Sequence, residues 1–101
     1  MSMANLQRMA MQMQAAIQKV QDDLATAQVE GTAGGGVVKA VVTGKQEIVS
    51  VTIDPSAVDP SDVEMLQDLI VAAIAEAQRA SREMAEAKMA AATGGMRLPG
   101  F

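Results

Sequence analysis

The chain has 101 residues, half of them hydrophobic, with no His, Cys, Trp or Tyr and a single aromatic side chain, Phe101. Without His or Cys, the sequence lacks the usual general base near neutral pH, cysteine nucleophiles, disulfides and Cys/His zinc sites. The lack of aromatic side chains removes stacking platforms for single-stranded nucleic acid. The sequence pI of about 4.6 also excludes a strongly basic domain. Composition therefore argues against an enzyme and, at first sight, against nucleic acid as a partner.

The first third of the chain predicts an amphipathic helix. Apolar side chains recur every three or four residues, which places them on one stripe: Leu6, Met9, Met13, Ile17, Val20 and Leu24. Glutamines fill many of the remaining positions and are good helix formers. No Gly or Pro interrupts the sequence before Gly31.

The middle of the chain predicts a three-stranded antiparallel sheet. Clusters of β-branched residues lie on both sides of Gly44, and Val49, Val51 and Ile53 alternate strictly with other residues. Thr43-Gly44-Lys45 supplies a tight hairpin turn between them. The glycine-rich residues 31–36 form a second turn, which leaves room for a short strand at about residues 28–33.

The start of the last helix carries a capping signal. Asp59 is expected to be the N-cap residue, with Pro60 at the first helical position. Val58 and Val63 are expected to pack across this cap as a hydrophobic staple.

The body of the last helix follows a heptad-like pattern. From Val63 to Ala91, apolar residues alternate at intervals of three and four, the spacing of a coiled-coil seam. The large aliphatic side chains stop at Ile74, and Ala and Met continue the stripe. Gly94 and Gly95 are expected to end the helix.

These lengths have an architectural consequence. Two helices of about 25 to 30 residues are each about 40 Å long, more than a small three-stranded sheet can cover. The excess must project or pack against another chain, and a monomer of this kind has a thin core. We therefore expect an α+β homodimer, with the sheet and the large aliphatic side chains at its interface.

We expect one domain over residues 1–93 and a flexible C-terminal tail over residues 94–101. Residues 1–14 have no continuous apolar core of the kind found in a signal peptide. The longest apolar stretch, Leu69 to Ala75, covers only about a third of a membrane span. These features predict a cytoplasmic protein without a membrane partner.

The net charge of -4 is concentrated in one short segment. Residues 54–68 contain five acidic side chains and no basic one, whereas basic and acidic groups nearly balance elsewhere. A partner that avoids this segment need not meet a negative surface.

Two motifs fall short of the sites that they suggest. Gly31 to Gly36 is not a phosphate-binding loop, because no Gly-Lys-Ser/Thr follows it, and Gly44-Lys45 precedes Gln46. The acidic segment lacks the alternate ligands and central glycine of an EF-hand, and helix capping explains part of it. No catalytic residue, metal site, cofactor or small-molecule substrate is predicted.

The basic residues of the last helix can be interpreted in two ways. Arg79, Arg82 and Lys88 are able to touch phosphate. They also fit the i,i+3 and i,i+4 ion pairs of a solvated helix face, namely Glu76–Arg79, Arg79–Glu83 and Arg82–Glu86. Arg8, Lys19 and Arg97 are equally open to both interpretations.

Several motifs together resemble a known family. They are Glu-Gly-x-x-Gly-x-Gly-x-Val-Lys at residues 30–39, Ile-Asp-Pro-Ser at 53–56, Glu-Met-Leu-x-Asp-Leu at 64–69, and the Gly-Met-x-Leu-Pro-Gly-Phe ending at 95–101. In this combination and order, after a Met/Gln-rich helix, the chain resembles the YbaB/EbfC family of bacterial nucleoid-associated proteins over essentially its whole length.

The resemblance implies a tweezer-like homodimer whose helices project as arms. It implies binding to double-stranded DNA with little sequence preference, and roles in nucleoid organisation and gene expression. The DNA-binding residues that it implies are Arg8, Lys19, Arg79, Arg82 and Lys88. Family members often have Lys in the first helix where this chain has Gln. The alternative function is a structural module that binds another protein through its Met- and Ala-rich arms, without direct DNA contact.

Overall fold

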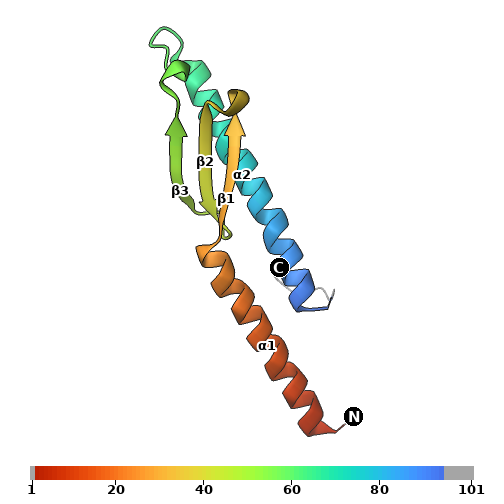
Figure 1. Ribbon diagram of the computed structural model, residues 1–101. Helices are drawn as coiled ribbons and strands as arrows, with labels where there is room; N and C mark the ends of the chain where they lie inside the picture. Colours follow the sequence, from red (N-terminus) through yellow and green to blue (C-terminus); the bar gives the residue numbers. More distant parts are fainter. Residues whose placement is uncertain (1, 95–101) are drawn as a thin grey trace.

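The computed structural model describes residues 2–94 and shows a helix, three strands and a second helix (Figure 1). The elements are α1 (Met3–Thr26), β1 (Gln28–Ala33), the 3-10 turn η1 (Gly34–Gly36), β2 (Val38–Thr43), β3 (Ile48–Ile53), the 3-10 turn η2 (Pro55–Ala57) and α2 (Val63–Ala92). The molecule measures 71 × 20 × 18 Å. The predicted α+β architecture is confirmed, with the strands in the predicted order.

The sheet is an antiparallel meander with strand order β1-β2-β3. Gly31 of β1 lies opposite Ala40 of β2, which in turn lies opposite Val51 of β3. Paired residues in antiparallel strands point to the same face. The side chains of β2 that point towards α2, those of Val38, Ala40 and Val42, are fully buried. β2 is therefore the central strand of the core.

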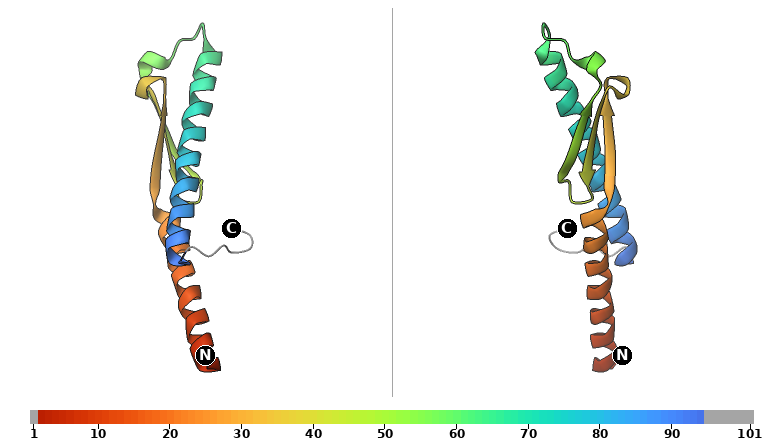
Figure 2. Two further views of the ribbon diagram at one scale, coloured as in Figure 1. Left: turned by 90° about the vertical axis from the view of Figure 1, so that its right-hand side faces the viewer. Right: turned by 60° about the vertical axis from the view of Figure 1, so that its left-hand side comes forward.

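Helix α2 lies along one face of the sheet, whereas no helix formed by residues 2–94 covers the opposite face (Figure 2). The helix presents Ala73 and Ala77, both fully buried, to the centre of the sheet. Gly31 makes this close contact possible, because a Cβ at that position would lie 2.8 Å from the Ala77 Cα. Small residues on both elements thus bring the α2 backbone directly against β1.

Helix α1 projects past the C-terminal end of α2 (Figure 1). Its apolar stripe is therefore divided. Leu24, near the sheet, is buried, whereas Leu6 and Met9 are about half exposed. The Ser2 hydroxyl caps the helix by accepting a hydrogen bond from the Asn5 amide. The projection expected from helix length is confirmed, and the first turns of α1 form an apolar arm.

The turn between β2 and β3 lies where it was predicted. β2 ends at Thr43, Gly44 and Lys45 form the turn, and Gln46 after them has a positive φ of 65°. Gly44 is needed for space, because a Cβ there would lie 2.7 Å from the Leu24 carbonyl oxygen. The glycine therefore lets the hairpin pack against the end of α1.

The predicted start of α2 was wrong. The N-cap residue is Asp62, whose carboxylate accepts a hydrogen bond from the Met65 amide at 3.2 Å. Asp59 instead closes a preceding turn by accepting bonds from the amide and hydroxyl of Ser61. Pro60 thus belongs to the turn. The proposed staple also fails, because Val63 becomes the first helical residue and is half exposed.

The end of α2 agrees with the prediction. The helix stops at Ala92, and Gly94 takes a φ of 65°, the left-handed conformation that commonly follows a helix. The predicted tail falls largely on residues 95–101, which lie outside the described residues. None of the helices formed by residues 2–94 has the length and apolar character that a membrane span requires.

Candidate nucleic-acid interface

The five predicted DNA-binding residues are all exposed on helices. Arg8 and Lys19 lie on α1, and Arg79, Arg82 and Lys88 lie on α2. Helix α2 runs back along the sheet towards α1 (Figure 1), so Lys88, near its end, lies towards α1, whereas Arg79 and Arg82 lie near its middle, beside the sheet. Their electrostatic surroundings are not equivalent, however.

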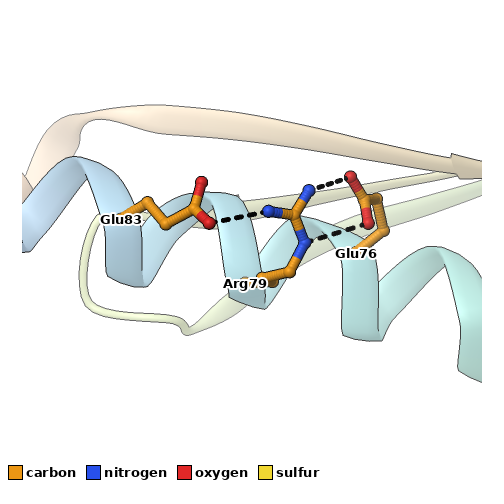
Figure 3. Close-up of polar contacts among 3 residues, drawn as sticks. All are labelled: Glu76, Arg79 and Glu83. Atoms are coloured by element: carbon orange, nitrogen blue, oxygen red, sulfur yellow. Dashed lines mark hydrogen bonds and ion pairs between the residues drawn. The ribbon is translucent and has the colours of Figure 1, made fainter.

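Arg79 is held by two carboxylates on its own helix (Figure 3). Its guanidinium donates to Glu76, with Nη2 2.5 Å from Oε1, and to Glu83, with Nη1 2.8 Å from Oε1. The hydrogen bond to Glu76 raises the pKa of Arg79 and lowers the pKa of Glu76. Two of the predicted helix ion pairs are therefore confirmed, and Arg79 would have to leave them to bind phosphate.

Lys19 is also paired. Its Nζ lies 3.0 Å from the Asp23 carboxylate, one turn later on α1. The lysine side chain is 77% exposed, so water screens this pair and its strength is modest. A phosphate could compete for Lys19 more readily than for Arg79, which two carboxylates hold.

The predicted pair between Arg82 and Glu86 is not formed. Both side chains are exposed, and ordering two long side chains in water for one screened contact brings little free energy. Arg8, Arg82, Lys88 and Lys45 make no ion pair with any residue in the 2–94 range. We call these four residues the exposed basic set.

The basic residues of α2 do not form one stripe. At about 100° per residue, Arg82 and Lys88 lie about 120° apart around the helix axis. A flat, rigid surface cannot contact Arg82 and Lys88 together, whereas a DNA groove or phosphate backbone that passes along the helix can. The arrangement suits contacts to several points of an extended anion more than a single compact site.

The acidic segment lies at the other end of the molecule, around η2 and the start of α2 (Figure 1). Two of its carboxylates serve local turns. The Ser56 amide lowers the pKa of Asp54, and the Ser61 hydroxyl and amide lower that of Asp59. Among residues 2–94, no group of three or more acidic side chains gathers closely enough to hold a metal ion. Asp54, Asp59 and Asp62 therefore have structural roles, and the whole segment lies away from the projecting part of α1.

The β2–β3 hairpin carries a further exposed basic residue, Lys45, which the sequence analysis considered only within Gly44-Lys45, a pair that fails as a phosphate loop. In the fold, Gln78 of α2 donates to the Gln46 carbonyl, so the hairpin touches the helix one turn before Arg82. The tertiary structure thus brings Lys45 towards the α2 basic residues.

The surroundings of Arg8 are largely apolar. Arg8 borders a shallow, open hollow on α1 that is also lined by Ala4, Gln7, Met11, Gln12 and Ala15. The adjacent Met3 is 75% exposed and Met11 68% exposed. This part of the arm offers a cation beside apolar surface, which fits a protein partner as well as a phosphate.

Comparison with protein families identifies the chain. Residues 1–96 match the YbaB/EbfC DNA-binding family. The chain belongs to this family. The predicted resemblance is therefore confirmed, and with it the assignment to DNA-binding, nucleoid-associated proteins.

Individual proteins are similar to this chain over most or all of its length. A nucleoid-associated protein of Moorella thermoacetica is 53% identical over 104 residues and covers 100% of both chains. A nucleoid-associated protein of Chloroflexus aurantiacus is 50% identical over 96% of this chain and 97% of its own length. The crystal structure of uncharacterized protein HP0035 from Helicobacter pylori has the same fold. It gives a TM-score of 0.72 at 22% identity, covering 86% of this chain and 91% of that one.

Proposed function

We propose that this YbaB/EbfC family member binds double-stranded DNA with little sequence preference, as a homodimer, and thereby affects nucleoid organisation and gene expression. Its place would be the nucleoid within the cytoplasm. The residues proposed to meet DNA are Arg8, Lys19, Arg79, Arg82 and Lys88. Of these, Arg8, Arg82 and Lys88 are the principal contacts, since carboxylates already occupy the other two.

One observation carries the proposal. Three of the predicted basic residues, Arg8, Arg82 and Lys88, have no ion pair inside residues 2–94 and lie on α1 or the C-terminal half of α2, while the acidic segment lies around η2 and the start of α2. DNA can approach the arms without meeting the acidic segment, whose field fades over about 10 Å at 0.1 M salt. The net charge of the protein is therefore a poor guide to its affinity for DNA.

The mechanism follows from the chemistry of the side chains. Arg and Lys contact phosphate oxygens, which carry no sequence information, so binding tolerates any duplex. Each contact releases condensed counterions, and the logarithm of the binding constant then falls by about 0.9 per phosphate contact for each unit rise in log salt. Arms that lack aromatic side chains leave no means of stacking on bases.

The direct test is an anisotropy titration of the protein against random and AT-rich duplexes at about 50 and 200 mM salt. We expect binding to both duplexes at the lower salt, with affinities within about threefold of each other, and a steep loss at the higher salt. A single-stranded oligonucleotide of the same length is the control and should bind more weakly. The absence of duplex binding at low salt would overturn the proposal.

The alternative is a protein-interaction module without direct DNA contact. The observation in its favour is the apolar arm, on which Met3, Leu6, Met9 and Met11 are exposed to between 49% and 75%. Such a surface is expected to bind apolar partners with little dependence on salt. The same titration separates the two functions, because only phosphate contact predicts duplex binding that salt abolishes.

The proposed homodimer rests on an apolar surface beside α2. Val51 lies opposite the buried Ala40 and therefore points to the helix-covered side of the sheet, yet it is 36% exposed. On α2, Val71 lies seven residues before Gln78 and so on the same side of the helix, the side that reaches the β2–β3 hairpin. Ile48, which lies opposite the buried Val42, extends this surface along β3 and is 55% exposed. Contiguous exposed apolar patches mark interaction sites. In a two-fold symmetric dimer each copy of the chain would cover the apolar surface of the other.

We expect Val51→Glu and, separately, Val71→Glu to convert the dimer to monomer in sedimentation velocity runs. A buried unpaired carboxylate at the interface is costly, whereas in the monomer both side chains reach water. Thr52→Glu is the matched control, since it adds the same charge on the opposite face of the same strand and should stay dimeric. If all three variants sediment like the parent protein, the interface lies elsewhere.

A further inference from the structure

The β2–β3 hairpin, residues 44–47, is fixed by both helices. The Gly44 amide donates to the Ala27 carbonyl at 3.1 Å, just after α1. From α2, the buried Ser81 hydroxyl donates to the Thr43 carbonyl at 2.9 Å, and Gln78 donates to the Gln46 carbonyl at 3.4 Å. The hairpin therefore stands at a defined position relative to both helices.

The backbone of the hairpin is also tightly restrained. Thr43 Oγ1 accepts from the amides of Lys45 and Glu47 at 3.1 and 3.3 Å, which satisfies the turn from within. Gln46 keeps a φ of 65°, a conformation that costs a non-glycine residue about 1 kcal/mol or more and persists only where its surroundings enforce it. This restraint fixes the direction in which Lys45 leaves the turn.

The side chain of Lys45 has no structural role among the described residues. Its side chain is exposed and forms no ion pair within the described stretch 2–94, not even with Glu47 two residues later. Gln78 donates to the carbonyl of Gln46, the residue after Lys45, and lies four residues before Arg82 on α2, so the backbone at Lys45 lies about one helical turn from Arg82. Like charges placed near each other repel, and an anion that binds both removes that repulsion.

We infer that Lys45 is an additional phosphate-binding residue, which continues the α2 contact surface from Arg82 onto the hairpin. The inference rests on the proposed function and extends the same site. It assigns DNA contact to the sheet body as well as to the arms. The duplex backbone would then be held at a point set by the fold, where the C-terminal end of α1 and the middle of α2 meet the hairpin.

The test compares two pairs of charge-neutralising variants in the same anisotropy assay. Lys45→Gln is expected to weaken duplex binding about threefold to tenfold and to reduce the salt slope by about 0.9, the value for one phosphate. Its control, Lys39→Gln, removes a lysine of the open sheet face that lies 4.0 Å from Glu30, and should change little. Glu47→Gln should strengthen binding, whereas Glu64→Gln, at the acidic end, should not.

The outcomes separate this inference from the proposed function. If the parent protein binds duplex but Lys45→Gln matches it in affinity and salt slope, Lys45 makes no contact, and the arm residues still account for binding. If Lys39→Gln weakens binding as much as Lys45→Gln, the loss reflects overall charge, and Lys45 makes no specific contact with phosphate. If the parent protein binds no duplex at low salt, both the proposed function and the inference are wrong. Sedimentation and thermal melting of each variant exclude an effect through assembly or folding.

Discussion

Arg82→Gln combined with Lys88→Gln is expected to weaken duplex binding about tenfold or more at 0.1 M salt, since a charge-assisted contact at a solvated surface contributes about 1 kcal/mol. Neither side chain has an ion pair to break within residues 2–94, so both are available to phosphate. The loss should be uniform across sequences, and the salt slope should fall by about 0.9 for each phosphate that the variant no longer binds. Anisotropy titrations over a salt series measure both quantities.

The matched control removes the same number of charges from cations that are already paired. Lys19→Gln combined with Arg79→Gln should change the affinity by less than about threefold, the remainder reflecting screened long-range charge. Conversely, Glu76→Gln combined with Glu83→Gln releases Arg79 and should tighten binding. If the two double arginine/lysine variants weaken binding equally, overall charge and not the pairing state decides affinity.

Gly31→Ala is expected to destabilise the protein by about 3 kcal/mol or more, because overpacking against a fixed backbone leaves no side chain to move aside. The added Cβ would lie 2.8 Å from the Ala77 Cα and would also contact the Ala77 amide nitrogen and the Ala73 carbonyl oxygen. Helix α2 would have to lift from β1, exposing the centre of the core. Urea denaturation at fixed protein concentration measures the change.

Thr32→Ala is the control for this substitution. Thr32 is the next residue of β1, is exposed and points to the open face, so its loss should cost less than about 1 kcal/mol. Should Gly31→Ala prove no more destabilising than Thr32→Ala, the close approach of α2 to β1 is not what stabilises the core.

Local patterns were sufficient to predict most of the fold. The 3–4 spacing of apolar residues predicts both helices, and the β-branched clusters around Gly44 predict the hairpin, because these signals depend on neighbours only a few residues apart. The predicted start of α2 was wrong because it, too, depended only on near neighbours. Asp59 and Asp62 are both good cap residues, and the Asp59–Ser61 turn decides between them.

The site was less predictable than the fold. The sequence allowed Arg79 and Arg82 to pair equally, with acids at i+4 from each. In the structure Arg79 takes Glu76 and Glu83 together, and Arg82 has no ion pair among residues 2–94. Exposed pairs differ by little free energy, so spacing alone does not select between them. The sequence could not place the hairpin that carries Lys45 beside α2, because the two segments in contact, at Gln46 and Gln78, lie more than thirty residues apart along the chain.

By itself, the sequence determined the order of elements, the absence of His and Cys chemistry, and the confinement of excess acid to residues 54–68. All three depend on composition or on contacts between near neighbours. Only the tertiary structure decided that α2 covers β1 and β2 but leaves Val51 of β3 open, and that the β2–β3 hairpin packs against the middle of α2. These features depend on which face of each element meets another across the fold, and that choice is made by close packing at Gly31 and Gly44.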